Sequence, residues 1–242
     1  MELFNNIAEY YDELYPVSNE QKNFFSAEIK SFPKPVKYLS IGSGSGSFEH
    51  FLAKEGLDVT GLETVQSLVD SANRKRRTQI MSLRFFQMSS LEMCRFLGKN
   101  FYNVISIFNG RMIFTHDETL MAKLFYDCHQ LLTENGKMIL QLPNFLKYTQ
   151  EKITLPCRES IRVKLFTKIS KDSNGKYYFN QTLETGNGKK LSVTEDMPIM
   201  PIKKSQIESY AKEAGFKECK FYSDFSPAEF TPDSDQIIAV IS

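Results

Sequence analysis

The sequence contains no tryptophan, only three histidines and only four cysteines. The cysteines, at positions 94, 128, 157 and 219, include no Cys-x-x-Cys pair, which argues against a zinc site or a thioredoxin-type motif. The chain is too long to be a small disulfide-stapled domain. We therefore expect buried free thiols in a reducing compartment and no bound metal.

The chain also has almost no net charge, with 30 Lys and Arg residues against 29 Asp and Glu residues. A near-neutral protein has no overall field that attracts nucleic acid or anionic lipid. No apolar run of about 18 residues is present to span a bilayer, and the first residues lack the basic region of a signal peptide. The sequence predicts a cytoplasmic globular protein without a nucleic-acid or membrane partner.

Short apolar segments alternate with helical patterns as far as residue 143. The expected strands cover 36–41, 57–62, 83–88, 104–108 and 137–142, and the helices between them 48–55, 65–77 and 117–132. A helix at 204–214 and strands at 218–222 and 236–241 follow. This alternation predicts an α/β fold: a seven-stranded, mostly parallel sheet with helices on both faces and an antiparallel strand at its end.

Two end signals mark the predicted helix at 117–132. Thr115 and Glu118 have the spacing of a capping box, and Asn135-Gly136 is a candidate left-handed stop. A different pattern appears later in the chain, where Asn-Gly pairs at 174 and 187 separate extended segments at 162–169, 177–185 and 190–197. These segments predict a small antiparallel insertion of three strands.

Three glycines, Gly42, Gly44 and Gly46, lie between the first strand and the first helix of this series. Such a loop lets a ligand approach main-chain N–H groups closely. The spacing Gly-x-Gly-x-Gly differs from the dinucleotide fingerprint, and no lysine follows as in a phosphate loop. Glu63 ends the second strand 21 residues after Gly42, where a carboxylate can accept both hydroxyls of a ribose.

With these motifs in order, the sequence resembles the class I S-adenosylmethionine-dependent methyltransferases of small-molecule type. The resemblance covers nearly the whole chain. The segments that carry it are 8–15, the glycine loop at 40–46, the second strand and its helix at 61–75, the fourth strand at 103–109, 131–140 and 214–216. It implies a Rossmann-like fold, with residues 1–30 as a helical lid. The cofactor domain would comprise 31–150 and 201–242, and 151–200 would form an antiparallel cap.

The resemblance also implies roles for individual residues. Backbone at Gly42, Ser43, Gly44 and Gly46 would line the methionine and ribose, Glu63 would bind the ribose hydroxyls, and Thr64 beside it would belong to the cofactor site. The remaining cofactor contacts would be Ser89, Ser90 and Leu91 at the adenine, Phe108 and Asn109 beside the sulfonium, and Tyr11 closing over the cofactor.

Two positions depart from the family pattern. Ser40 stands where the family usually has an acidic residue before the loop, and Ser89 where it often has an aspartate. A hydroxyl lacks the charge that roughly doubles the strength of such a hydrogen bond. The departures predict weaker cofactor binding and leave open the loss of binding or catalysis.

His116 follows the fourth strand, near the sheet edge where ligands of α/β folds bind, and is the candidate general base. The simpler interpretation is that His116 is a polar residue at the start of a helix. The basic run at 74–77 fits a solvated helix end better than a nucleic-acid patch.

The predicted function is in-line transfer of a methyl group from S-adenosylmethionine to a small-molecule acceptor, by a monomer or homodimer. The alternatives are a weak or inactive protein that binds this cofactor, an RNA methyltransferase and an NAD(P)-dependent oxidoreductase.

Overall fold

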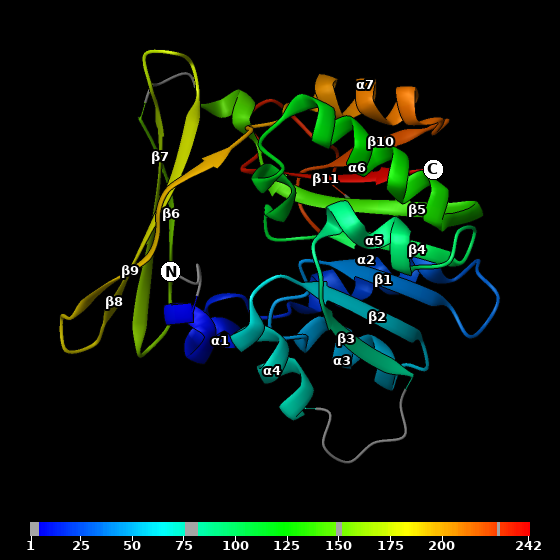
Figure 1. The fold of residues 1–242 in the computed structure, drawn as a ribbon, viewed down its shortest axis with the longest axis horizontal. Coiled ribbons are helices and arrows are strands. Elements are labelled where there is room, and N and C mark those ends of the chain that lie inside the picture. Colours follow the sequence, from blue (N-terminus) through cyan, green and yellow to red (C-terminus); the bar gives the residue numbers. More distant parts are fainter. Residues whose placement is uncertain (1–4, 76–81, 149–151, 227) are drawn as a thin grey trace.

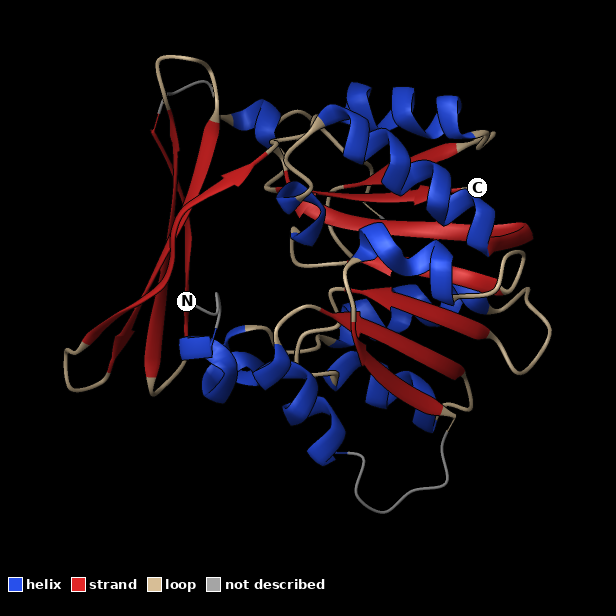
Figure 2. Cartoon of the chain, in the orientation of Figure 1, coloured by secondary structure: helices blue, strands red, loops and turns tan. Residues whose placement is uncertain are grey.

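A seven-stranded sheet forms the body of the molecule in the computed structural model, which describes residues 5–75, 82–148, 152–226 and 228–242 (Figures 1 and 2). Its strand order is β10-β11-β5-β4-β1-β2-β3. The parallel strands at its centre are β1 (Lys37–Ile41), β2 (Asp58–Glu63), β3 (Leu83–Gln87), β4 (Tyr102–Ile107) and β5 (Leu132–Pro143). The predicted α/β class and mostly parallel sheet are confirmed.

We expected the antiparallel strand at the end of the sheet. The structure instead places this strand, β11 (Gln236–Ile241), between β5 and β10 (Cys219–Tyr222). Five consecutive residues of β11, 237–241, are buried, because the strand is covered on both faces and paired on both edges. β10 has no such run, and Lys220 is exposed on it. A continuous apolar run is the pattern of an interior strand.

Helices cover both faces of the sheet, and successive residues of β1 contact opposite sides. Leu39 and Ile41 pack in a core with α5 (Met93–Phe96), α6 (Glu118–Leu131) and α7 (Lys204–Ala214). Tyr38 packs in a second core with α2 (Asn19–Ile29), α3 (Ser47–Lys54) and α4 (Gln66–Lys75). The alternation follows from the two-residue period of a strand.

Both predicted end signals of α6 are wrong. The side chain of Asp117 caps the helix by accepting a hydrogen bond from the Leu120 N–H at 3.1 Å, in place of a box at Thr115. The helix ends at Leu131 and β5 starts at the next residue. Asn135-Gly136 falls within β5 at a register shift in its pairing with β4, so the pair makes a bulge where we expected a helix stop.

A second, smaller sheet stands beside the first, and the described residues give it four strands, β6 (Lys152–Glu159), β7 (Val163–Lys171), β8 (Tyr177–Thr185) and β9 (Lys190–Ile199) (Figure 1). The predicted antiparallel insertion had three strands and did not include β6. That strand contains Pro156, is mostly exposed and shifts register between Leu155 and Arg158, so its sequence shows little alternation.

One face of the small sheet is apolar at both ends and polar in the middle. At one end Val163 and Leu165 pack on the N-terminal helices η1 (Asn5–Tyr10) and α1 (Tyr11–Leu14) and on α4. At the other end Ile169 and Phe179 pack on residues that follow β4 and β5. The small sheet is therefore fixed to the body at two places, with a gap in the apolar contact between them.

All four cysteines are free, but only Cys128 is buried, and Cys157 is exposed on β6. The expectation of buried thiols is thus wrong for Cys157. None of the helices in the described ranges combines the length and apolar composition needed to cross a bilayer. Two residues of the basic run, 76 and 77, lie outside the described part of the chain.

Candidate active site

The loop after β1, residues 42–46, turns sharply at its three glycines, whose φ angles are 76°, 58° and 76°. Residues other than glycine rarely adopt this left-handed region. The Leu62 carbonyl accepts hydrogen bonds from the N–H groups of Gly42 and Ser43, at 2.8 and 2.9 Å. The loop is therefore held against the end of β2, where Glu63 lies.

Glu63 is only 2% exposed, and its carboxylate serves as the internal acceptor for the turns around it. One oxygen accepts from the N–H of Gly44 at 2.9 Å, and the other accepts from the N–H groups of Thr64 and Val65 at 2.8 and 3.1 Å. The predicted juxtaposition of Glu63 and the glycine loop is thus present in the structure. Hydrogen bonds to backbone N–H groups hold the carboxylate in one orientation.

Tyr11 and Arg111 lie over this loop. The Gly44 Cα faces the Tyr11 ring, and a Cβ built on Gly42 would come 2.7 Å from Cγ of Arg111. Arg111 donates to the Tyr11 hydroxyl at 3.4 Å and forms an ion pair with Glu63 at 3.7 Å. Burial raises the pKa of the Tyr11 phenol to about 12, so it stays protonated.

The sequence analysis did not predict Arg111. Burial by itself lowers the pKa of this guanidinium, but the Glu63 carboxylate and the Tyr11 hydroxyl outweigh burial and raise it. The signal available in the sequence is its position: it is a cation two residues after Asn109, at the sheet edge that also carries Glu63. Arg111 and Glu63 form a nearly buried ion pair at the centre of the site.

A cavity of about 250 Å³, which we call the edge cavity, opens at the ends of β2 and β3. The predicted cofactor residues that line it are Gly42, Glu63, Thr64, Ser89, Ser90 and Leu91. His116 lines it too and is exposed. Ser89 caps the short helix η2 (Ser90–Glu92) by accepting from the Leu91 N–H at 3.3 Å.

A second cavity, of about 40 Å³, lies on the other side of the glycine loop, and we call it the loop cavity. The residues of the predicted set that line it are Tyr11, Gly42, Ser43, Phe108 and Asn109, and Ser40 and Glu49 line it too. Phe108 is 6% exposed and packs in an aromatic cluster with Phe25 and Phe48. Asn109 has a left-handed φ of 56°, and its N–H donates to the Gln141 side chain at 3.1 Å.

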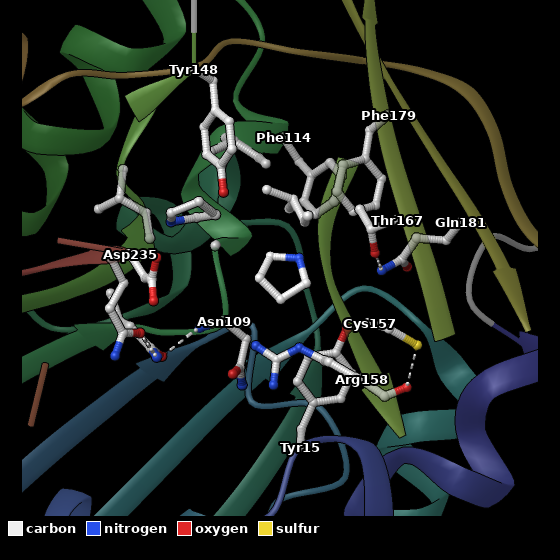
Figure 3. A pocket seen from close by; sticks show the side chains of 18 residues that line it. Tyr15, Asn109, Phe114, Tyr148, Cys157, Arg158, Thr167, Phe179, Gln181 and Asp235 are labelled. Atoms are coloured by element: carbon white, nitrogen blue, oxygen red, sulfur yellow. Dashed lines mark hydrogen bonds between the residues drawn. The ribbon is translucent and has the colours of Figure 1, made fainter. Parts of the chain in front are cut away.

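The largest of the three cavities, about 370 Å³, lies between the sheet edge and the small sheet; we call it the interface pocket (Figure 3). Tyr15, Asn109 and Arg158 stand on one side of it, and Phe179, Thr167 and Gln181 on another. Arg158 lies 4.4 Å over the Tyr15 ring. His116 does not line this pocket.

Thr167 and Gln181 are directly paired across β7 and β8, in the polar middle of the otherwise apolar face. The Gln181 amide nitrogen donates to the Thr167 hydroxyl at 2.9 Å, while its carbonyl oxygen is buried and has no partner among the described residues. A buried acceptor without a donor costs free energy unless a ligand supplies one. Sequence reasoning missed this pair, because only the pairing of the strands brings it together.

Comparisons with known proteins find similarity to methyltransferases. Residues 39–140 match the model of the methyltransferase domain family. A protein of Geobacillus sp. (strain WCH70) that is named as a methyltransferase is 24% identical over 148 residues, which are 60% of this chain and 59% of the relative. The match thus spans less than two thirds of that relative.

Two solved structures share the fold over almost the whole chain. An S-adenosylmethionine-dependent methyltransferase from Clostridium acetobutylicum is 17% identical, with a TM-score of 0.78 and coverage of 99% of this chain and 98% of the other. CalS10 from Micromonospora echinaspora, described as an amino pentose methyltransferase with S-adenosylmethionine bound, is 12% identical, with a TM-score of 0.69 and coverage of 99% and 98%.

Proposed function

We propose that the chain is a class I S-adenosylmethionine-dependent methyltransferase and that it methylates a small molecule held in the interface pocket. One observation carries the proposal. Asn109, at the end of β4, lines both the loop cavity and the interface pocket, and Phe114 lines both the edge cavity and the interface pocket. A donor bound along the glycine loop and an acceptor in the interface pocket would therefore meet at one place.

The residues present suit S-adenosylmethionine, which supplies an electrophilic methyl group on a sulfonium. Left-handed glycines leave the loop backbone open to close approach, and the buried Glu63 carboxylate beside the edge cavity can accept the ribose hydroxyls. Ser89, Ser90 and Leu91 would then contact the adenine, and Phe108 and Asn109 the sulfonium end. Tyr11 would cover the donor once it has left its position over Gly44.

The size and lining of the interface pocket favour a small acceptor over a polymer. A volume of about 370 Å³ is within the range of small-molecule sites. Positioning of the acceptor in line with the methyl group can supply much of the rate. Gln181 supports an acceptor that carries a hydroxyl or amine, because its open carbonyl oxygen needs a donor. The amino pentose methyltransferase among the structural relatives is consistent with this chemistry.

For His116 we propose a contact with the nucleoside part of the donor and no role as a general base. A base must reach the proton it removes, and His116 lines the edge cavity without lining the interface pocket. We also propose that the N-terminal helices η1 and α1 form a lid and 151–200 a cap, since these two helices pack between α4 and the small sheet. The rest of the predicted lid at 1–30 includes α2, which packs on the main sheet.

Calorimetric titration with S-adenosylhomocysteine tests the cofactor part of the proposal. The wild-type protein should bind it saturably, and Glu63→Gln should bind about 10- to 100-fold more weakly, because a hydrogen bond to a charged group contributes about 1.5–3 kcal/mol. Glu55→Gln, an exposed glutamate at the end of α3, is the matched control and should bind normally.

Absence of any binding at millimolar ligand would overturn the proposal. Binding without transfer of labelled methyl to any fraction of a small-molecule extract would favour a protein that only binds the cofactor. Saturable binding of NADPH in its place would revive the oxidoreductase alternative, and salt-dependent retention of tRNA the RNA methyltransferase.

A further inference from the structure

Glu49 is a buried carboxylate that the proposed function leaves without a role. It lies in the first turn of α3, is 3% exposed and lines the loop cavity together with Ser40. Burial raises the pKa of Glu49 to about 7, and the nearby Ser40 hydroxyl partly offsets this by favouring the ionised form. A carboxylate in such a place is costly unless a cation or several donors compensate it.

The cation that acts on Glu49 from within the protein is already bound elsewhere. Lys75 of α4 lowers the pKa of Glu49, but its ammonium pairs with Asp12 at 2.5 Å and donates to the Ser45 carbonyl and the Ser47 hydroxyl at 3.0 and 2.9 Å. Among the described residues, no Lys or Arg forms an ion pair with Glu49. Glu63 of β2 acts on Glu49 as a further acidic neighbour, and Glu49 in turn raises the pKa of the buried Tyr38 phenol of β1.

The position of Glu49 relative to Glu63 indicates which part of a ligand it would meet. Glu63 faces the edge cavity, where the nucleoside is proposed to bind, and Glu49 faces the loop cavity on the other side of Gly42. The methionine end of the donor therefore falls beside Glu49. That end carries an α-ammonium with three N–H donors, whereas the sulfonium has none for a carboxylate to accept.

We infer that Glu49 binds the α-ammonium of the methionine moiety and that Ser40 positions its carboxylate. This inference rests on the proposed function, and it gives the serine at position 40 a physical meaning. The negative charge at this site comes from the helix after the loop, and the strand before it supplies a hydroxyl that holds the charged side chain. Ser40 is 3% exposed, so the pair is shielded from water.

Two ligands test the inference, S-adenosylhomocysteine and 5′-methylthioadenosine. They share the nucleoside and the thioether, but only the first has the amino-acid end. Glu49→Gln should weaken binding of S-adenosylhomocysteine about 10- to 100-fold and change binding of 5′-methylthioadenosine less than twofold. Glu55→Gln on the same helix serves as the control, and thermal unfolding of each variant verifies the fold.

A second variant moves the charge back to the strand. In Ser40→Asp/Glu49→Gln the carboxylate should restore at least tenfold of the lost affinity for S-adenosylhomocysteine. If the wild type binds both ligands and Glu49→Gln weakens neither, or weakens both equally, the ammonium contact is wrong while the proposed function stands. A wild type that binds neither ligand overturns both.

The pH dependence of binding gives an independent readout. Binding of the ammonium needs the ionised carboxylate, so affinity for S-adenosylhomocysteine should fall as the pH is lowered from 8 to 6. Affinity for 5′-methylthioadenosine should stay nearly flat, and Glu49→Gln should remove the difference between the two ligands. A slope that persists unchanged in Glu49→Gln would contradict the inference.

Discussion

The backbone of the glycine loop and the polar middle of the small sheet are organised in different ways, although each region holds one buried side-chain oxygen, Ser43 Oγ and Gln181 Oε1, without a partner among the described residues. In the loop, the N–H groups of Gly42, Ser43 and Gly44 are bonded to the end of β2. In the small sheet, the Gln181 carbonyl oxygen has no partner among the described residues. The loop backbone is thus fixed by groups close in the fold's central β-α-β unit, while the small sheet carries a polar group that a ligand or a water molecule would satisfy. In the proposed function, the loop would hold the donor and the polar middle of the small sheet would contact the acceptor.

The mutation with the largest expected effect on stability lies in the glycine loop. A Cβ on Gly46 would come 2.5 Å from the Phe85 ring and 2.9 Å from Cβ of Ala72, at a φ of 76°. Gly46→Ala should therefore lower the free energy of unfolding by about 2–4 kcal/mol, from overpacking and left-handed strain together.

Gly188, in the hairpin between β8 and β9, is the matched control. Its φ is 81°, and nothing lies within 4 Å of an added Cβ. Gly188→Ala should cost only about 1–2 kcal/mol, the strain alone. If urea unfolding shows the same loss of unfolding free energy for the two variants, packing around Gly46 contributes nothing to the difference in stability.

A somewhat smaller effect concerns Glu49 and pH. Its folded pKa of about 7 lies above the ordinary 4.5, so the native state retains a proton that the unfolded chain loses. The stability from this group is complete below pH 4.5 and disappears as the pH rises through 7, by at most about 3 kcal/mol. Thermal unfolding of the ligand-free wild type should therefore weaken from pH 5 to 8 relative to Glu49→Gln. Parallel curves would contradict the assignment.

The smallest expected effect on stability concerns the polar middle of the small sheet. Thr167→Val/Gln181→Leu removes a hydrogen-bonded pair together with its unsatisfied oxygen, and such replacements are nearly neutral or stabilising. We expect the free energy of unfolding to change by less than about 1 kcal/mol, while methyl transfer to the acceptor is lost and binding of S-adenosylhomocysteine is kept. A variant that transfers methyl normally would remove Gln181 from the acceptor site.

The same contrast explains what the sequence could predict. The strand, glycine loop and helix around Gly42 are contiguous, and Glu63 follows at a spacing set by one β-α-β unit, so local patterns were enough to bring them together. The interface pocket combines Tyr15, Asn109, Arg158, Gln181 and Asp235, which only the tertiary fold unites. Arg111 and Glu49 were missed for another reason: each looks like an ordinary surface charge until burial is known.

The stacking of Tyr11 on Tyr15 couples the proposed donor site to the proposed acceptor pocket. The two rings are 4.7 Å apart, and Tyr15 lines the interface pocket with the Arg158 guanidinium over its face. A donor that displaces Tyr11 from Gly44 must also move its stacking partner and so reshape the wall of the acceptor pocket. We expect the two substrates to add in a compulsory order, donor first. The methylated product should then inhibit noncompetitively against both substrates, whereas random addition would make it competitive with the acceptor.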